Sequence, residues 1–342
     1  MENKKELLLK VEGLETHFPV KKGVFKRTVA HVRAVDGVDL EVYRGETLGV
    51  VGESGCGKTT LGKSILQLYR PTAGSVEYTF PEGKKDLRKL SHKDLDEARK
   101  KLQIVFQDPY SSLNPAFTIF GSFVDPLNKF GVKKKSKQQK LVGDLLEAVN
   151  LPRDYMSRYP NEFSGGQRQR IGIARALSVN PELIVCDEAV SALDVSIQAQ
   201  VLKLLKKLQI ERNLTYLFIT HDLSVVEYVS DRIAVMYLGK IVELANTEEL
   251  FKNTLHPYTR ALLSAIPIAD ITKKRKRIPL QGDVPSPVNP PSGCPFHPRC
   301  PNCKEKCKVE KPLLTTYQIE KEEHFVACHF AMEFMHENKM SE

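Results

Sequence analysis

Short apolar segments alternate with longer amphipathic segments along most of the chain. The apolar runs at 47–51, 183–186 and 216–219 have the length and the β-branched content of buried strands. Between them lie segments with helical spacing, such as 201–208, whose apolar residues fall on one face. Strands that alternate with helices predict an α/β fold with a mostly parallel core sheet, which binds ligands at the carboxyl ends of its strands.

Further patterns on either side of the first buried strand add to this core. Residues 7–11 and 38–42 have the pattern of short strands and predict an antiparallel edge sheet. Residues 84–101 and 133–151 are charged and helical in pattern, and they predict an inserted helical subdomain.

Composition supports a globular protein with one large α/β domain and a smaller appendage. The chain has 342 residues, of which 41% are hydrophobic and 27% charged. No run reaches the ~18 apolar residues of a membrane span, and Leu7–Leu9 is too short for a signal-peptide core, so we expect a cytoplasmic chain. The net charge of +9 is spread over basic clusters that solvated loops explain better than lipid or nucleic-acid binding.

The turn after the strand at 47–51 has the chemistry of a phosphate-binding loop. Residues 52–59 satisfy G-x-x-x-x-G-K-[ST] between a strand and a predicted helix at 58–68. The glycines let backbone N–H groups wrap a phosphate, Lys58 reaches the outer phosphates, and Thr59 can ligate Mg²⁺. The predicted nucleotide contacts are Gly52, Ser54, Gly55, Cys56, Gly57, Lys58, Thr59 and Thr60.

Two other loops carry complementary chemistry. Asp187 and Glu188 end the strand at 183–186; Asp187 would hold Mg²⁺ through water, and Glu188 would polarise the water that attacks the γ-phosphate. Residues 164–167 begin a predicted helix and offer a second anion-binding surface. Lys58 and Ser164 are 106 positions apart in one chain, and a geometry in which each loop completes the other's site requires a partner chain.

These motifs, in this order, resemble the complete motif set of ABC-transporter ATPases over roughly residues 7–250. The motifs are the P-loop, Gln107, Phe163-Ser164-Gly165-Gly166-Gln167, Asp187-Glu188, Ser191-Ala192-Leu193-Asp194 and His221. Phe163 stands where the family more often has Leu, and Ala189 where Pro often follows the glutamate. Neither difference removes a functional group.

The resemblance implies a head-to-tail dimer in which ATP at one P-loop is covered by the partner's Ser164, Gly165, Gly166 and Gln167. It implies that Gln107 senses Mg²⁺ and the attacking water, that His221 contacts the γ-phosphate and that Asp194 links the two sites. With Glu188 and His221 both present, we expect a hydrolytically competent site.

The aromatic residue that stacks on adenine is less sharply marked. Phe18, near the end of the first strand, is our candidate. The basic stretch 21–27 resembles an insertion, and it contains Phe25 as the alternative.

The C-terminal part differs in composition from the rest. Five of the seven cysteines lie at 294–328 and ten of the twenty prolines at 267–312. In a reducing cytosol such cysteines favour a metal or an iron–sulfur centre over disulfides. Their spacing, C-x₅-C-x₂-C-x₃-C and then a gap of 20 residues, suits tetrahedral zinc and a [4Fe–4S] cluster equally.

Three segments narrow the family. Residues 256–267, which have the pattern of a helix that ends before Pro267, and 293–300 resemble the C-terminal region of dipeptide/oligopeptide permease ATPases, and residues 190–200 resemble the second ATPase subunit of such systems. The resemblance implies a [4Fe–4S] cluster on Cys294, Cys300, Cys307 and Cys328, with Cys303 additional and zinc as the alternative. It also implies an ATPase domain at 1–254, with its helical subdomain at about 108–178, and a transporter-type C-terminal region at 255–342.

The function implied is an ATPase subunit that drives import of di- and oligopeptides. Its partners would be a second ABC ATPase, two transmembrane permease subunits and, indirectly, an extracytoplasmic peptide-binding protein, at the cytoplasmic face of a bacterial or archaeal membrane. No nucleic-acid partner is expected. The alternatives are a related importer of nickel or another small solute, a soluble ABC ATPase acting on nucleic acid or ribosomes, and an iron–sulfur regulator that uses ATP only structurally.

Overall fold

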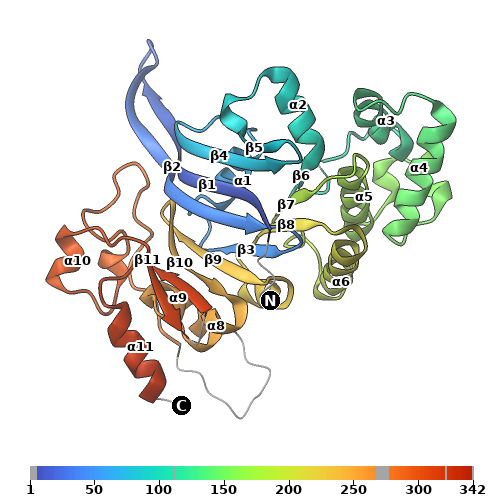
Figure 1. Cartoon of the computed structure of the whole chain (residues 1–342). Helices are drawn as coiled ribbons and strands as arrows, with labels where there is room; N and C mark the ends of the chain where they lie inside the picture. Colours follow the sequence, from blue (N-terminus) through green and yellow to red (C-terminus); the bar gives the residue numbers. More distant parts are fainter. Residues whose placement is uncertain (1–5, 111, 267–276, 320–321, 341–342) are drawn as a thin grey trace. The chain divides into compact units, whose positions relative to one another are not determined.

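A computed structural model describes residues 6–110, 112–266, 277–319 and 322–340 (Figure 1). The chain divides into two compact units. Unit 1 comprises 1–6, 43–46 and 89–219, and unit 2 comprises 7–42, 47–88 and 220–342. The expected helix end at Pro267 lies outside the described residues. The described part of the chain contains no helix that is long and apolar enough to span a bilayer.

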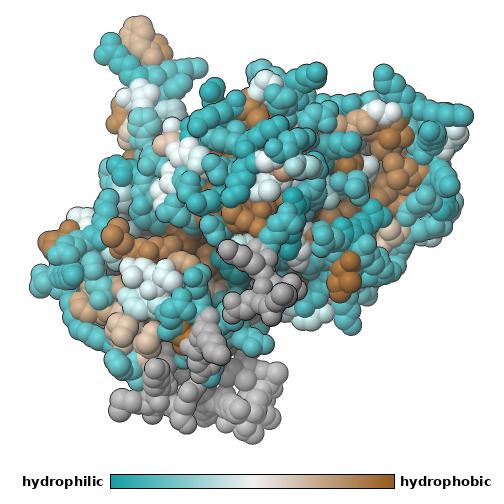
Figure 2. Space-filling model, in the orientation of Figure 1, coloured by the Kyte–Doolittle hydropathy of each residue, from teal (hydrophilic) through white to brown (hydrophobic). Residues whose placement is uncertain are grey.

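Unit 2 contains the expected antiparallel sheet, with longer strands than the sequence pattern indicates. Its order is β2-β1-β4-β5, formed by β1 (Leu7–Lys22), β2 (Arg27–Tyr43), β4 (Ala73–Phe80) and β5 (Gly83–Asp86). The expected short strands are only the inner ends of β1 and β2. Beyond Thr16, β1 buries no residue, so the outer half of the hairpin carries no hydrophobic alternation to indicate it. Figure 2 shows apolar side chains exposed at the tip of this hairpin.

The expected helix at 84–101 is wrong in its first part. Residues 83–86 form β5, which pairs with 77–80 of β4. The Asp86 carboxylate then accepts the N–H of Val76 at 3.3 Å, which ties the end of the hairpin to β4. The helix itself, α2 (His92–Lys101), begins only at Ser91, whose hydroxyl accepts the N–H of Asp94 and caps it.

The second sheet of unit 2 is mixed. β3 (Thr47–Val51) runs parallel to β9 (Arg232–Tyr237), and β10 (Lys240–Asn246), β12 (Glu322–Val326) and β11 (Thr315–Ile319) follow as antiparallel neighbours. The helices of this unit are α1 (Lys58–Ile65), α7 (Leu223–Val229), α8 (Thr247–Lys252), α9 (Pro257–Ser264), α10 (Glu305–Val309) and α11 (Ala331–Met340). The C-terminal region therefore extends the sheet that carries β3.

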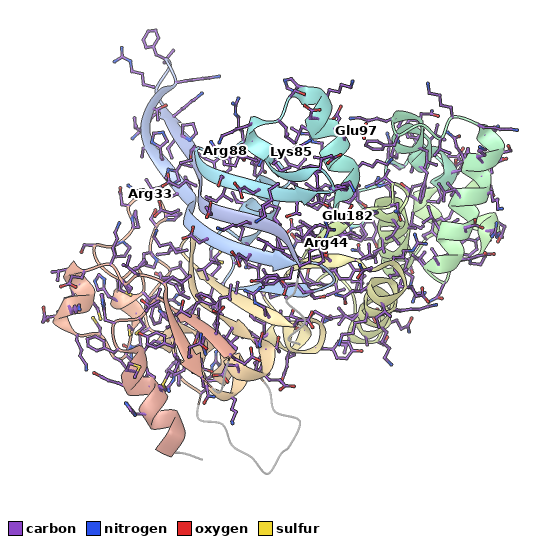
Figure 3. The ribbon with its side chains drawn as sticks, in the orientation of Figure 1. Arg33, Arg44, Lys85, Arg88, Glu97 and Glu182 are labelled. Atoms are coloured by element: carbon purple, nitrogen blue, oxygen red, sulfur yellow. The ribbon has the colours of Figure 1, made fainter. Side chains whose placement is uncertain are left out.

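Unit 1 contains three parallel strands and the helical subdomain. The strands β7 (Leu183–Asp187) and β8 (Thr215–Ile219) are parallel neighbours, as predicted, and β6 (Leu102–Val105), which was not predicted from the sequence, pairs in parallel with β7. The helices α3 (Ile119–Lys129), α4 (Lys135–Ala148) and α5 (Gly165–Leu177) gather into one cluster, and α6 (Val195–Arg212) follows β7 (Figure 1). Arg44 pairs with Glu182 at 2.6 Å and so fixes the segment 43–46 to the start of β7 (Figure 3).

Because Gly49 has no side chain, α7 can pack directly on β3. A Cβ at this position would lie 2.1 Å from Val226 Cγ1 and 2.6 Å from Ser230 Oγ. We expect Gly49→Ala to lower the free energy of unfolding by about 1–3 kcal/mol, because overpacking forces the backbone or its neighbours to shift. Urea unfolding measures this change.

The matched control for this substitution is Gly172→Ala, inside α5. A Cβ there meets no atom within 4 Å, so the variant should gain about 0.5–1 kcal/mol from helix propensity. Equal stability of the two variants would contradict the packing argument.

Candidate functional site

The phosphate-binding loop of unit 2 connects a fully buried strand to a helix. All five residues of β3 are buried, and Thr47 N–H donates to the Asp231 carboxylate at 2.7 Å. Gly57, at the start of α1, has φ of 109°, and a Cβ there would lie 2.0 Å from the carbonyl oxygen of Ala34. Only glycine fits this position, so the second glycine of the motif is fixed by conformation and by space.

Lys58 is folded back onto the loop that it belongs to. Its ammonium donates to the carbonyl oxygens of Gly52 at 2.7 Å and Glu53 at 3.0 Å, and the residue is only 4% exposed. Cys56 is also buried, and burial raises the pKa of its thiol, so it is neutral and fills space in the loop. The lysine ammonium therefore lies at the N-terminus of α1. The positive charge and the helix dipole both favour the binding of an anion there.

Two residues of the C-terminal region hold Glu53 of this loop. The Tyr258 hydroxyl accepts the Glu53 N–H at 2.9 Å. The Arg299 guanidinium donates to both carboxylate oxygens of Glu53, at 2.6 and 3.0 Å. None of these three was among the predicted site residues, although Tyr258 and Arg299 lie inside the two C-terminal segments that carry the family resemblance.

In unit 1, the end of β7 carries the two predicted carboxylates. Asp187 is buried, at 3% exposure. Glu188 has φ of 48°, a left-handed conformation that is uncommon for a glutamate, and its N–H donates to the carbonyl oxygen of Ile219 at 2.9 Å. Gln107 donates from Nε2 to Glu188 Oε2 at 2.8 Å. The structure thus brings the predicted glutamine and glutamate together.

The Ser-Gly-Gly-Gln sequence begins α5, at a helix N-terminus as predicted. Ser164 and Gln167 form a capping box: the serine hydroxyl accepts the Gln167 N–H at 3.3 Å, and the glutamine side chain accepts the Ser164 N–H at 3.0 Å. A Cβ on Gly166 would lie 2.4 Å from Ile197 Cγ2 on α6. The second glycine therefore allows α5 and α6 to approach closely.

Asp194 lies at the N-terminus of α6, and His221 lies in the loop between β8 and α7. The exposed Asp194 carboxylate caps α6 by accepting the Ile197 N–H at 3.1 Å, and this hydrogen bond lowers the pKa of the carboxyl. His221 is exposed and belongs to unit 2, where Thr220 N–H donates to the carbonyl oxygen of Val50 at 3.2 Å. This hydrogen bond holds His221 beside the strand that leads into the phosphate-binding loop.

The two candidate adenine-stacking residues have different surroundings. Phe18 packs edge-on against Tyr69, with ring centroids 5.4 Å apart, and nearby Thr16 and Ser64 hydroxyls hydrogen-bond at 2.8 Å, which joins β1 to α1. Phe25 lies in the hairpin turn at 86% exposure.

Four cysteines of unit 2 line one small cavity of about 20 Å³. They are the four predicted ligands, Cys294, Cys300, Cys307 and Cys328. Cys303 is absent from the cavity's lining. Burial raises the pKa of Cys294 and Cys300 to about 11 and that of Cys328 to about 12. Burial of this kind favours the neutral thiol at pH 7 for these three side chains.

The side chains of the cavity are not arranged around a single ion. Among the residues described, no three His, Cys, Asp or Glu side chains are positioned to hold a metal ion. Tetrahedral zinc needs its thiolates roughly 4 Å apart, given a Zn–S distance of about 2.3 Å. The donor set nevertheless matches the four thiolates that an iron–sulfur cluster uses.

The predicted site residues thus fall into two sets. Unit 2 contains the phosphate-binding loop with Thr59 and Thr60, together with Phe18, His221 and the four cysteines. Unit 1 contains Gln107, Asp187, Glu188, Asp194 and the Ser164–Gln167 sequence.

Comparison with known proteins gives matches over nearly the whole chain. A family profile described as ABC transporter matches residues 35–191, and one described as Oligopeptide/dipeptide transporter, C-terminal region, matches residues 242–307. The chain is 51% identical to the oligopeptide transport ATP-binding protein AppF of Bacillus subtilis, over 95% of this chain and 97% of that protein. It is 54% identical to the putative oligopeptide transport ATP-binding protein YkfD of the same organism, over 94% and 95%.

Solved structures agree on the fold. The ATP-binding cassette MJ0796, as a post-hydrolysis dimer bound to ADP and Pi, matches with a TM-score of 0.61 at 29% identity, covering 70% of this chain and 99% of that chain. The cbiO1 protein of Clostridium perfringens, part of the ABC transporter complex cbiONQ, also matches with a TM-score of 0.61, at 25% identity over 72% and 91%. With these cassettes sharing its fold and relatives identical at about half of its positions, the chain belongs to the ABC-transporter family of oligopeptide transport ATP-binding proteins.

Proposed function

We propose that this chain binds and hydrolyses ATP to power the import of di- and oligopeptides across the cell membrane. The observation that carries the proposal is the union of two features in one chain. A cassette with P-loop, strand-terminal glutamate and the sequence Ser164–Gln167, here called the signature sequence, is followed by the C-terminal region found in oligopeptide/dipeptide transporters. The relatives that match over nearly the full length have names that refer to oligopeptide transport.

The site residues divide the chemistry of ATP hydrolysis among them. The loop 52–60 binds the phosphates, and Lys58 exchanges its carbonyl partners for phosphate oxygens. Thr59, Gln107 and Asp187 are the residues that would hold Mg²⁺, which would neutralise phosphate charge when bound. Glu188, already hydrogen-bonded to Gln107, accepts the proton of the attacking water.

The remaining nucleotide contacts come from His221, from Asp194 and from the partner's copy of the signature. His221 contacts the γ-phosphate, and Phe18 stacks on adenine in preference to Phe25. The half-buried position of Phe18 against Tyr69 supports this choice, because an ordered ring loses less entropy on stacking than one at an exposed hairpin tip.

The signature sequence requires a second ATPase in head-to-tail arrangement. The capping box at Ser164 satisfies that helix N-terminus in the free chain, and the γ-phosphate of a nucleotide on the partner would replace it. Two transmembrane permease subunits and an extracytoplasmic peptide-binding protein complete the importer, with this chain peripheral at the cytoplasmic face. We assign ATPase chemistry to 1–254, its helical subdomain to about 108–178, and the transporter-specific role to 255–342.

The four-cysteine cavity is proposed to hold a [4Fe–4S] cluster, with zinc as the alternative. Its support is the set of lining residues: the four cysteines predicted as ligands line it, and Cys303 does not. When bound, such a cluster supplies a rigid cross-link or a redox-responsive centre.

Glu188→Gln tests the hydrolytic role of the glutamate. Because glutamine cannot accept a proton but keeps the shape and hydrogen-bonding capacity of the side chain, we expect ATP turnover to fall by about 100-fold or more while ATP binding persists. Phosphate release and nucleotide titration measure the two quantities. Glu211→Gln, at an exposed α6 position paired with Lys207, is the control and should turn over ATP normally. Full-rate hydrolysis by Glu188→Gln would contradict the assignment.

Uptake in the native host tests the transported substrate. Cells whose chromosomal copy carries Glu188→Gln should lose accumulation of a radiolabelled tripeptide, because hydrolysis powers import. Accumulation of ⁶³Ni²⁺ should be unchanged. Lost nickel uptake with normal peptide uptake would favour the small-solute importer.

Affinity purification of the tagged chain in mild detergent tests the proposed assembly. It should recover a second ABC ATPase and two multi-span proteins. Recovery of ribosomes or nucleic acid would overturn the importer proposal and favour a soluble ABC ATPase.

Anaerobic purification tests the cysteine assignment. Wild-type protein should contain about four iron and four sulfide per chain, as a [4Fe–4S] centre requires. Cys300→Ser should lose this iron, because it removes one of the four cavity thiols, whereas Cys303→Ser should retain it. Stoichiometric zinc without iron in the wild type would overturn the cluster in favour of zinc.

A further inference from the structure

Two residues of the C-terminal region, Tyr258 and Arg299, form hydrogen bonds with Glu53 of the phosphate-binding loop. Tyr258, on α9, accepts the backbone N–H of Glu53. Arg299, in the short helical turn His297–Arg299, binds the carboxylate with both terminal nitrogens. These partners lie 205 and 246 positions along the chain from Glu53, so the contacts join two distant parts of the sequence within unit 2.

The Arg299–Glu53 pair has the properties of a strong interaction. The Arg299 side chain is 6% exposed and that of Glu53 is 26% exposed, so water screens the pair weakly. Hydrogen bonding to Glu53 raises the pKa of Arg299, which therefore stays charged. A guanidinium that donates two hydrogen bonds to a carboxylate also fixes the orientation of that carboxylate, whereas an ammonium that donates one does not.

The residues that carry these two partners are held rigidly. The Phe296 ring lies 5.3 Å from that of Tyr237 and 5.4 Å from that of Tyr258, and it is 1% exposed. The backbone of the same segment is tied to the cysteine-rich region, because Cys294 N–H donates to the carbonyl oxygen of Cys307 at 2.8 Å. Arg299 is thus presented from a fixed support rather than from a mobile loop.

Glu53 is in turn part of the loop's own geometry. Its carbonyl oxygen accepts from the ammonium of Lys58, and the Cys56 N–H donates to the same oxygen at 3.3 Å. Movement of Glu53 therefore moves the turn whose N–H groups and lysine are to meet the phosphates. The contacts of Arg299 and Tyr258 with Glu53 can therefore change the geometry of the phosphate site although neither residue contacts the nucleotide.

We propose that Arg299 and Tyr258 are positioning residues for the phosphate-binding loop, through which the C-terminal region sets the affinity of this ATPase for nucleotide. The inference rests on the proposed binding of ATP at residues 52–60. It adds a role in nucleotide binding for a region that is otherwise assigned to transport.

The experiment is a double-mutant cycle on the purified full-length chain, with Arg299→Met and Glu53→Gln, alone and combined. The readout is the Kd for a fluorescent ATP analogue with Mg²⁺. Each single variant should bind about 10-fold more weakly, the size expected for hydrogen bonds between charged groups. The double variant should be no weaker than the weaker single one, because the two changes remove the same interaction.

Further variants separate positioning from general destabilisation. Arg299→Lys keeps the charge but loses the two-pronged geometry, so it should recover part of the affinity. Tyr258→Phe removes only a hydroxyl and should weaken binding a few-fold at an unchanged Tm. Lys304→Met is the control, because this lysine belongs to the same segment but pairs with the exposed Glu333. The Kd of this variant for the ATP analogue should match that of the wild type. In turnover, KM for ATP should rise with kcat nearly constant.

The outcomes distinguish this inference from the proposed function. Wild-type protein that fails to bind the analogue overturns the ATP-binding proposal itself. Wild-type binding with an unchanged Kd in Arg299→Met and Tyr258→Phe, or additive losses in the double variant, overturns only the positioning role.

Discussion

A loop that binds phosphate through its backbone has to leave N–H groups available for the anion, so only some of them can hold its own shape. Inside this loop Cys56 N–H donates to the carbonyl oxygen of Glu53, and further support comes from outside the loop. The buried strand β3 fixes its entry, Gly239 N–H donates to the carbonyl oxygen of Cys56 at 2.9 Å, and Arg299 and Tyr258 hold Glu53. Lys58 adds an internal support, because its ammonium donates to the carbonyl oxygens of Gly52 and Glu53.

A related constraint applies to the end of β7 in unit 1, where the carboxylates proposed for catalysis lie. Glu188 is held in a left-handed conformation in which its own N–H and carbonyl groups bond to Ile219 and Ser191. Such a conformation is unfavourable for a residue with a side chain and persists only where the surroundings impose it. Here those bonds leave the carboxylate directed at Gln107, at 2.8 Å. The backbone strain is thus coupled to the placement of the carboxylate that we propose as the proton acceptor.

The sequence allowed prediction of the features that depend on local chemistry. The phosphate-binding loop, the helix start at Ser164 and the strand-terminal Asp187 could each be predicted, because turn glycines, a capping residue and an apolar run are local signals. The four cysteines were predicted as a ligand set from their spacing together with the family resemblance, and all four line one cavity.

Other features depend on distant pairings that no window of sequence contains. The outer hairpin of β1 and β2 has no buried face and so no hydrophobic period. The contact between Arg299 and Glu53 joins residues 246 positions apart, and an arginine in a proline- and cysteine-rich segment carries no signal that it is buried. The charged residues of β5 have a pattern that predicts a helix. They form a strand because they pair with β4.

The C-terminal region contributes to the packing of the ATPase core, because it supplies the partners of a buried carboxylate on β10. Glu243, on β10, is fully buried, and its Oε1 accepts from Leu255 N–H at 2.7 Å and His256 N–H at 3.2 Å and contacts His324 Nε2 at 2.9 Å. All three partners lie beyond residue 254. A chain that ended there would leave this carboxylate buried without them, at a cost that buried acceptors seldom bear. β10 is the strand next to β9, and β9 pairs with β3, so the same loss reaches the strand that leads into the phosphate-binding loop. The C-terminal region therefore supports the ATPase core at two places, at Glu243 on β10 and at Glu53 in the loop that follows β3.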